Sequence, residues 1–230
     1  AVGGRYCGEP IGNCRYSDIT VFSFHPVKII TTGEGGMALT NIPSLANKMK
    51  LLRSHYITTN AAEMHDRPSE EIWNYQQIGL GFNYRMSDIH AALGLSQIER
   101  VDEFVGKRHA IAQRYNELLT ELPVIKPKQI EESFSSFHLY VIRLKLNEIN
   151  NSQRQVFAAF HEQGVCVNLH YIPVYLQPHY QDMGFKRGYC PEAEAYFSEA
   201  MSIPIFPTLS KEQQDYILEI LKNTTRNKCL

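Results

Sequence analysis

The sequence lacks long apolar runs, an excess of charge of one sign, and a regular cysteine pattern. No apolar run among the 230 residues approaches the roughly 20 that a transmembrane helix needs, so we expect no membrane partner. With 23 basic and 24 acidic residues the formal charge is -1, which gives no reason to expect a nucleic-acid partner. The five cysteines are odd in number and lack CxxC spacing. We therefore expect neither a disulfide framework nor a metal site, and a reducing, cytoplasmic setting.

The remaining composition is that of an ordinary globular protein, with 43% hydrophobic residues. Residues 18–24 are rich in β-branched and aromatic side chains and predict a buried strand. After Pro123 the pattern alternates between strands and helices, which predicts an α/β class and a domain boundary between residues 121 and 122. The helices predicted from apolar spacing and capping residues are 43–53, 87–98, 101–119, 152–163, 191–200 and 210–221; the further strands are 37–40, 137–146 and 165–167.

The most informative segment is the run from Ser23 to Gly36, in which Lys28 follows a predicted strand and precedes a glycine-rich turn. Val27, Ile29 and Ile30 flank this lysine, and we expect them to desolvate it, lower its pKa and make the amine nucleophilic. Such an amine could form a Schiff base, although the same pattern fits a surface lysine on a loop. Nearby hydroxyls that could hold an anion such as a cofactor phosphate belong to Ser23, Thr31 and Thr32.

Three motifs give the chain a family resemblance. The run SDITVFSFHPVKIITTGEGGMALTN at 17–41 resembles the active-site signature of the DegT/DnrJ/EryC1/StrS sugar aminotransferases, which depend on pyridoxal phosphate (PLP). GFNYRMSDIHAA at 81–92 resembles a second motif of the family, and HYIP at 170–173 a weaker third. The first motif is most similar to the branch that aminates C4 of UDP-linked 4-keto-6-deoxy-N-acetylhexosamines for pseudaminic acid.

The resemblance implies a fold and the residues that hold the cofactor. It implies an α/β, fold-type I transferase, with the end of the PLP-binding large domain at 1–121 and a small α/β C-terminal domain at 122–230. Lys28 matches the lysine that carries PLP as a Schiff base, and Ser23 matches the hydroxyl that binds its phosphate. Asn83 matches an asparagine that reaches the neighbouring subunit's PLP, so the resemblance also implies a homodimer.

The resemblance also places candidate residues around a nucleotide-sugar substrate. Arg85 is a candidate for its diphosphate, although an arginine near a helix start is also an ordinary surface residue. His25 is a candidate for the sugar site, or a structural residue of its turn. His170 and Tyr171 lie in a segment that the family has near the substrate entrance. Glu34 is interpreted as a loop residue rather than an acid or base.

The implied reaction is a two-stage exchange of an amino group. An amino-acid donor, by resemblance L-glutamate, loads the cofactor, and the keto-sugar then receives the group. Lys28 would transfer the proton in both stages, while PLP would act as the electron sink.

Part of the family's site has no counterpart in the sequence. The aspartate that protonates the PLP ring belongs to an upstream motif, and residues 1–6 resemble the stretch directly after it. We therefore expect this chain to hold only the C-terminal part of the enzyme's fold and to be inactive alone. Three origins stay open: a longer chain lost the upstream portion, another chain supplies it, or the product is a non-functional remnant. Its exposed strand edges predict that the chain either associates strongly or comes from a complex with the missing portion.

Two other functions compete with the aminotransferase. A related PLP-dependent sugar dehydratase would carry histidine in place of Lys28, so this residue argues against it. A non-catalytic dimerisation or regulatory module of the same fold is favoured by the missing aspartate. Absorbance of a PLP–lysine adduct would separate the enzyme from the module.

Overall fold

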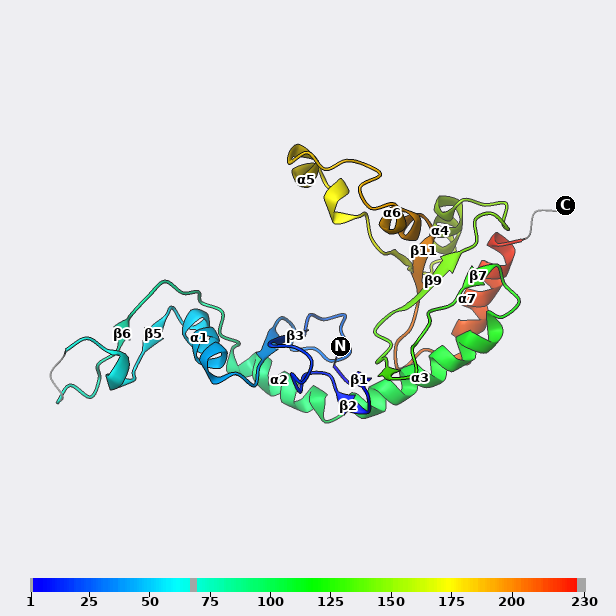
Figure 1. Cartoon of the computed structure of the whole chain (residues 1–230). Helices are drawn as coiled ribbons and strands as arrows, with labels where there is room; N and C mark the ends of the chain where they lie inside the picture. The colour runs from blue at the N-terminus through cyan, green and yellow to red at the C-terminus, as the bar shows by residue number, and fades with distance from the viewer. Residues whose placement is uncertain (1, 67–69, 227–230) are drawn as a thin grey trace. The chain divides into compact units, whose positions relative to one another are not determined.

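A computed structural model describes residues 2–66 and 70–226, coloured along the chain in Figure 1. The chain forms two compact units. Unit 1 comprises Ala1–Val101 with Glu132–Phe134, and unit 2 comprises Asp102–Glu131 with Ser135–Leu230. Within the described residues, no helix is both long and apolar enough to cross a membrane.

Unit 1 is built from short antiparallel strands and two helices. The strands β1 (Arg5–Tyr6), β2 (Glu9–Pro10) and β8 (Ser133–Phe134) form a sheet in the order β2-β1-β8. The strands β3 (Thr20–Ser23) and β4 (Gly36–Leu39) pair with each other, as do β5 (Ile57–Thr58) and β6 (Gln76–Gln77). The helices are α1 (Pro43–Arg53), the 3-10 turn η1 (Ala61–Glu63) and α2 (Asp88–Ile98).

The predicted strand at 18–24 is present as β3, but the prediction that it is buried is wrong for one of its faces. Phe22 is 8% exposed, whereas its neighbour Val21 is 72% exposed. The side chains of these two neighbours point to opposite faces of the strand, so within the described residues the face that carries Val21 is open to solvent. The strand therefore has a buried and an open face, rather than the two buried faces that its composition suggested.

The two helix starts of unit 1 follow their capping signals. Pro43 is the first residue of α1, where its fixed φ suits a helix start. The hydroxyl of Ser87 accepts a hydrogen bond from the backbone N–H of His90 and caps α2.

Unit 2 contains a four-stranded antiparallel sheet in the order β10-β11-β9-β7. Its strands are β7 (Val124–Ile125), β9 (Tyr140–Leu144), β10 (Asn168–Leu169) and β11 (Ala200–Ile203). Its helices are α3 (Val101–Leu118), which begins at the last residue of unit 1, α4 (Gln153–Glu162), η2 (Val174–Leu176), α5 (Pro178–Asp182), α6 (Pro191–Glu199) and α7 (Lys211–Thr224). The sequence did not predict β11 as a strand, and the strand predicted at 165–167 begins instead at residue 168.

The apolar core of the chain lies in unit 2, where helices α3, α4 and α7 pack with β9 and β11. Tyr140, Ile142 and Leu144 alternate along β9 and are fully buried. Tyr115 of α3 and Phe160 of α4 join the same cluster, both with no exposed surface. Because α3 contributes to this core, the boundary between the compact units falls at the start of that helix, upstream of the expected 121/122. That domain boundary itself stays a prediction.

A buried arginine ties α3 to two backbone segments of unit 2. Arg108 is 5% exposed, and its Nη1 donates to the carbonyls of Phe137 (3.0 Å), His138 (3.3 Å) and Ile205 (2.8 Å). Burial lowers the pKa of this guanidinium. The cation therefore satisfies carbonyls that the irregular segments before β9 and after β11 would otherwise leave unpaired.

Candidate active site

The loop that carries Lys28 is closed at its base by backbone hydrogen bonds. Phe24 N donates to Gly35 O at 2.8 Å, and Thr32 N donates to Phe24 O at 3.0 Å. The hydroxyl of Thr31 donates to the same Phe24 carbonyl at 3.0 Å. Residues 24–35 thus form a tied loop between β3 and β4, which fixes the positions of the side chains that it presents.

Lys28 lies in a turn of this loop and is only partly buried. Its backbone N–H donates to the carbonyl of His25 at 2.9 Å. The next two residues, Ile29 (7% exposed) and Ile30 (3%), anchor the turn in unit 1, while Val27 is 63% exposed. Within the described part of the chain, the Lys28 amine has no hydrogen-bond or ion-pair partner. Of the three flanking apolar residues, only Ile29 and Ile30 are buried, and they anchor the backbone of the turn.

Helix α2 packs on the loop through small residues. A Cβ atom on Gly94 would lie 2.8 Å from Cγ2 of Thr32, which is 1% exposed. At Gly35, whose φ is 153°, a Cβ would lie 2.5 Å from Oγ1 of the same threonine. These close approaches need glycine, and the one at Gly94 brings α2, which begins within the second motif, against the loop of the first.

The three hydroxyls that we expected to hold an anion differ in whether they are already hydrogen-bonded to the protein. Thr31 Oγ1 accepts from Gly33 N at 2.9 Å in addition to its bond with Phe24. Thr32 Oγ1 donates to Glu34 O at 2.7 Å and is buried. Ser23 is exposed, and its Oγ only accepts a 3.4 Å bond from the N–H of His25. Of the three predicted hydroxyls, only that of Ser23 can donate to a bound anion.

His25 and Glu34 face each other across the loop. His25 Nε2 lies 3.7 Å from Glu34 Oε1, and both side chains are at least half exposed, at 50% and 73%. This pair and the Lys28 amine belong to one short loop, and the Ser23 hydroxyl lies at the end of the strand that precedes it. An amine without a protein partner and an exposed hydroxyl are the groups that a Schiff base and a phosphate require, so the residues present fit PLP.

Asn83 and Arg85 lie in a segment whose backbone is hydrogen-bonded to the end of α1. Asn83 forms an isolated antiparallel bridge with Ser54, and Tyr84 N donates to Arg53 O at 2.9 Å. Both Asn83 and Arg85 have exposed side chains. The backbone therefore holds these two predicted residues in place while their side chains stay available.

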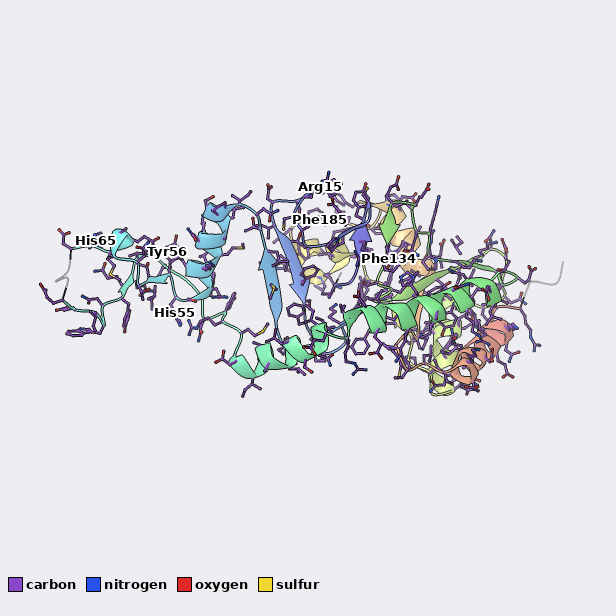
Figure 2. All side chains as sticks on the ribbon, turned by 90° about the horizontal axis from the view of Figure 1, so that it is seen from below. Arg15, His55, Tyr56, His65, Phe134 and Phe185 are labelled. Atoms are coloured by element: carbon purple, nitrogen blue, oxygen red, sulfur yellow. The ribbon has the colours of Figure 1, made fainter. Side chains whose placement is uncertain are left out.

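A tight chain reversal precedes this segment. His55 (φ 59°) and Tyr56 (φ 60°), labelled in Figure 2, adopt left-handed backbone conformations directly after α1. A Cβ at Gly81 would lie 2.4 Å from Tyr56 N, so only glycine fits there. Backbone conformations of this kind are retained where the surrounding structure fixes them, and here the reversal lies beside the bridge between Ser54 and Asn83.

His170 and Tyr171 belong to unit 2. His170 is 7% exposed, and its Nε2 is buried with no hydrogen-bond partner among the described residues. Burial lowers the pKa of this imidazole, which favours the neutral form. The ring contacts Tyr171 edge-to-face at 4.7 Å between centroids, and Tyr171 is 69% exposed. A buried polar atom without a partner is a candidate contact for a ligand.

The structure thus divides the predicted residues between the units. Ser23 at the end of β3 and His25 and Lys28 on the loop that follows lie in unit 1, and Asn83 and Arg85 lie on another segment of that unit. Sequence reasoning missed the contact of Thr32 with Gly94. No cluster of His, Cys, Asp and Glu that could bind a metal occurs in the described ranges.

Comparison with known proteins identifies the family. The model of the DegT/DnrJ/EryC1/StrS aminotransferase family matches residues 1–222. A UDP-4-amino-4,6-dideoxy-N-acetyl-β-L-altrosamine transaminase of Campylobacter jejuni is 31% identical over all of this chain and 58% of its own length.

Solved structures agree with this assignment. Helicobacter pylori PseC, an aminotransferase involved in the biosynthesis of pseudoaminic acid, is 28% identical and superposes with a TM-score of 0.86 over 98% of this chain and 57% of its own. A Streptococcus pneumoniae protein provisionally named a sugar aminotransferase, in its PLP form, gives a TM-score of 0.85 at 29% identity, over 97% of this chain and 55% of its own. The chain therefore spans just over half the length of these relatives, and the expected fold-type I architecture is confirmed for that part. The chain belongs to the DegT/DnrJ/EryC1/StrS aminotransferase family.

Proposed function

We propose that the protein is, or forms part of, a PLP-dependent aminotransferase that transfers an amino group from L-glutamate to C4 of a nucleotide-linked 4-keto-6-deoxy-sugar for surface-glycan biosynthesis. The observation that carries the proposal is the Lys28 amine, held without a protein partner on a tied loop that also presents the Ser23 hydroxyl. Relatives named as UDP-sugar transaminases support the substrate class. The substrate and donor belong to the whole protein, of which this chain spans a part.

Lys28 and Ser23 have separate tasks in this proposal. Bound PLP supplies an electron sink for the bond changes at the substrate carbon. Lys28 Nζ would hold this cofactor. In the first stage the amine takes up the proton from the donor carbon that bears the amino group, and in the second it delivers a proton to C4 of the keto-sugar. Ser23 Oγ donates to the phosphate, because its proton is not used within the described residues. The buried side chains of Ile29 and Ile30 keep the amine in place during these steps.

The remaining predicted residues serve the substrate and the neighbouring subunit. Arg85 presents a cation suited to a diphosphate, and His25, oriented by Glu34, presents a ring to the sugar. His170 and Tyr171 contribute from unit 2. Asn83, whose side chain is exposed, reaches the PLP phosphate of a second copy, so we propose a homodimer that works in the cytoplasm.

A half-reaction tests this function. The chain is mixed with PLP, L-glutamate and the N-terminal portion of the Helicobacter pylori relative that it does not match, and 2-oxoglutarate is measured. We expect about one 2-oxoglutarate per Lys28 without a keto-sugar and repeated turnover with a UDP-linked 4-keto-6-deoxy-sugar. Lys28→Arg should abolish both, whereas Lys48→Arg, at an exposed lysine of α1, should change neither. Equal 2-oxoglutarate from Lys28→Arg would refute the assignment.

A further inference from the structure

A loop of unit 2 presents an exposed aromatic ring from an unusually well-fixed backbone. The segment after β10 contains η2 and α5 and extends away from the sheet of β9 and β11, in yellow to ochre in Figure 1. It returns to α6 through residues 184–190, which we call the clasp loop. Its sequence, GFKRGYC, is not among the residues that the proposed function uses.

The clasp loop is fixed by the carboxylate of Glu194, which lies on α6. Glu194 Oε1 accepts hydrogen bonds from the N–H of Gly188 at 2.6 Å and the hydroxyl of Tyr175 at 2.8 Å. The same tyrosine hydroxyl accepts from Cys190 N at 3.2 Å and lies 3.0 Å from Cys190 O. The hydrogen bond from Gly188, followed by that from Tyr175, lowers the pKa of Glu194, so the carboxylate is charged at neutral pH. Charge-assisted bonds of this length are strong enough to fix a short loop.

The backbone of the loop depends on glycine. Gly188 has a φ of 88° and Gly184 a φ of 99°, and a Cβ at either position would meet no other atom within 4 Å. The two glycines are therefore required by backbone conformation and not by crowding. They allow the turn in which Tyr189 N bonds to Lys186 O at 3.2 Å and which brings Gly188 N to Glu194.

Tyr189 is exposed to solvent although its ring contacts two other aromatic rings. Its centroid lies 5.0 Å from that of Phe185, labelled in Figure 2, and 5.4 Å from that of Tyr175. Despite these contacts the residue is 68% exposed. A rigid aromatic ring on a fixed loop can bind a second flat ring with little loss of conformational entropy.

Arg187 of the clasp loop and Glu194, which fixes this loop, line a cavity. Arg187, two residues before Tyr189, has a side chain that is 81% exposed and lies 3.6 Å from Glu194. Arg187, Glu194, Leu176 and Arg154 of α4 line a cavity of about 370 Å³, together with five other residues. This volume is within the range of small-molecule sites. The two arginines and the one carboxylate among the lining residues together carry a net charge of about +1. Guanidinium groups suit the oxygens of a diphosphate.

From these observations we propose that the clasp loop recognises the nucleoside diphosphate part of the substrate. Tyr189 stacks on the base, Arg187 and Arg154 bind the diphosphate, and Glu194 with Tyr175 are positioning residues. This inference rests on the proposed function only for the identity of the ligand as a nucleotide-linked sugar. Arg85 remains the separate candidate contact from unit 1.

Binding of UDP to the chain without PLP tests the proposal, with Tyr189→Ala as the main variant. Tyr16→Ala is the matched control, because Tyr16 is 61% exposed and also contacts another tyrosine ring, at 5.2 Å. Loss of one base stack should weaken UDP binding by roughly tenfold in Tyr189→Ala and leave Tyr16→Ala unchanged. Arg187→Met should weaken binding of UDP and pyrophosphate but not of uridine.

Photocrosslinking with 5-iodo-UDP tests the positioning role. The label should attach to Tyr189, and Glu194→Gln should lower its yield several-fold while the unfolding midpoint of the chain stays unchanged. Absence of saturable UDP binding, or equal affinity in Tyr189→Ala, would overturn the proposal. Self-association that Tyr189→Ala abolishes, with UDP affinity unchanged, would also overturn it and identify the surface as an interface between copies. These experiments contain no PLP and do not involve Lys28, so none of these outcomes bears on the role proposed for Lys28.

Discussion

Buried polar side chains in unit 2 act on backbone that has no regular partner. Arg108 bonds to three carbonyls outside the sheet, so its loss would leave several buried acceptors without donors. We expect Arg108→Met to lower the free energy of unfolding by about 3 kcal/mol. Each buried group left without a partner costs about 1–3 kcal/mol, and water that enters the site can satisfy some of the three carbonyls. Arg114→Met, on the same helix, removes a pair with a 60%-exposed Asp215 and should cost less than about 1 kcal/mol. Urea unfolding compares them, and equal losses would contradict the role given to Arg108.

His170 makes the stability of the chain depend on pH. Burial holds its pKa below the ordinary value of 6.5, so the unfolded chain takes up a proton at a pH where the folded chain does not. Its contribution to stability is therefore present above pH 6.5 and declines as the pH falls through that value. Between pH 7.5 and pH 5.5, the wild type should lose more unfolding free energy than His170→Gln. His179→Gln, at an exposed histidine, should keep the wild-type slope, and a slope unchanged in His170→Gln would contradict this account.

At the scale of elements, α2 contacts the loop at 24–35 at a position where the helix carries no side chain, Gly94. A methyl group on Gly94 would lie 2.8 Å from Thr32, so Gly94→Ala should separate the helix from the loop and cost about 1–3 kcal/mol. Gly106→Ala is the matched control, because a Cβ there meets nothing within 4 Å on the exposed side of α3. It should instead stabilise the helix by about 0.5–1 kcal/mol. Thermal unfolding measures both, and a neutral Gly94→Ala would show that the helix is not held by this contact.

Elements with strong local signals were predictable, and those set by partners were not. Pro43 and Ser87 start α1 and α2 as their types indicate. By contrast, β11 follows a helix and is a strand because β9 and β10 pair with it on both sides. No pattern within the short apolar stretch at 200–207 specifies those partners.

The candidate site shows the same division between local and distant causes. The residues around Lys28 could be selected from its apolar neighbours and nearby hydroxyls, and the roles that we propose for them come from the resemblance of a specific motif. The sequence could not predict which of these hydroxyls stay available, because Thr31 and Thr32 form hydrogen bonds with backbone atoms of their own loop. The hydrogen bond from Gly188 N to the Glu194 carboxylate could also not be predicted, because a carboxylate six residues from a glycine is a common pattern.

At the scale of the whole molecule, the apolar core is distributed unequally. The buried hydrophobic residues of unit 1 are Phe22, Phe24, Ile29 and Ile30, whereas the clustered core belongs to unit 2. Amide hydrogens of β9 and β11 should therefore exchange more slowly than those of β3 and β4. The N-terminal portion of a relative should slow exchange in β3 by covering the face of Val21. Equal exchange in the two units, or no added protection, would contradict this picture.

The central claim is that Lys28 carries PLP, and reduction with borohydride tests it most directly. The chain is incubated with PLP, alone and with the N-terminal portion of the Helicobacter pylori relative, and is then reduced, digested and mapped by mass spectrometry. The account predicts absorbance at roughly 410–430 nm that reduction removes, with a pyridoxyl group on the peptide containing Lys28. A label spread over exposed lysines such as Lys48, or none on Lys28 even with the added portion, would contradict it.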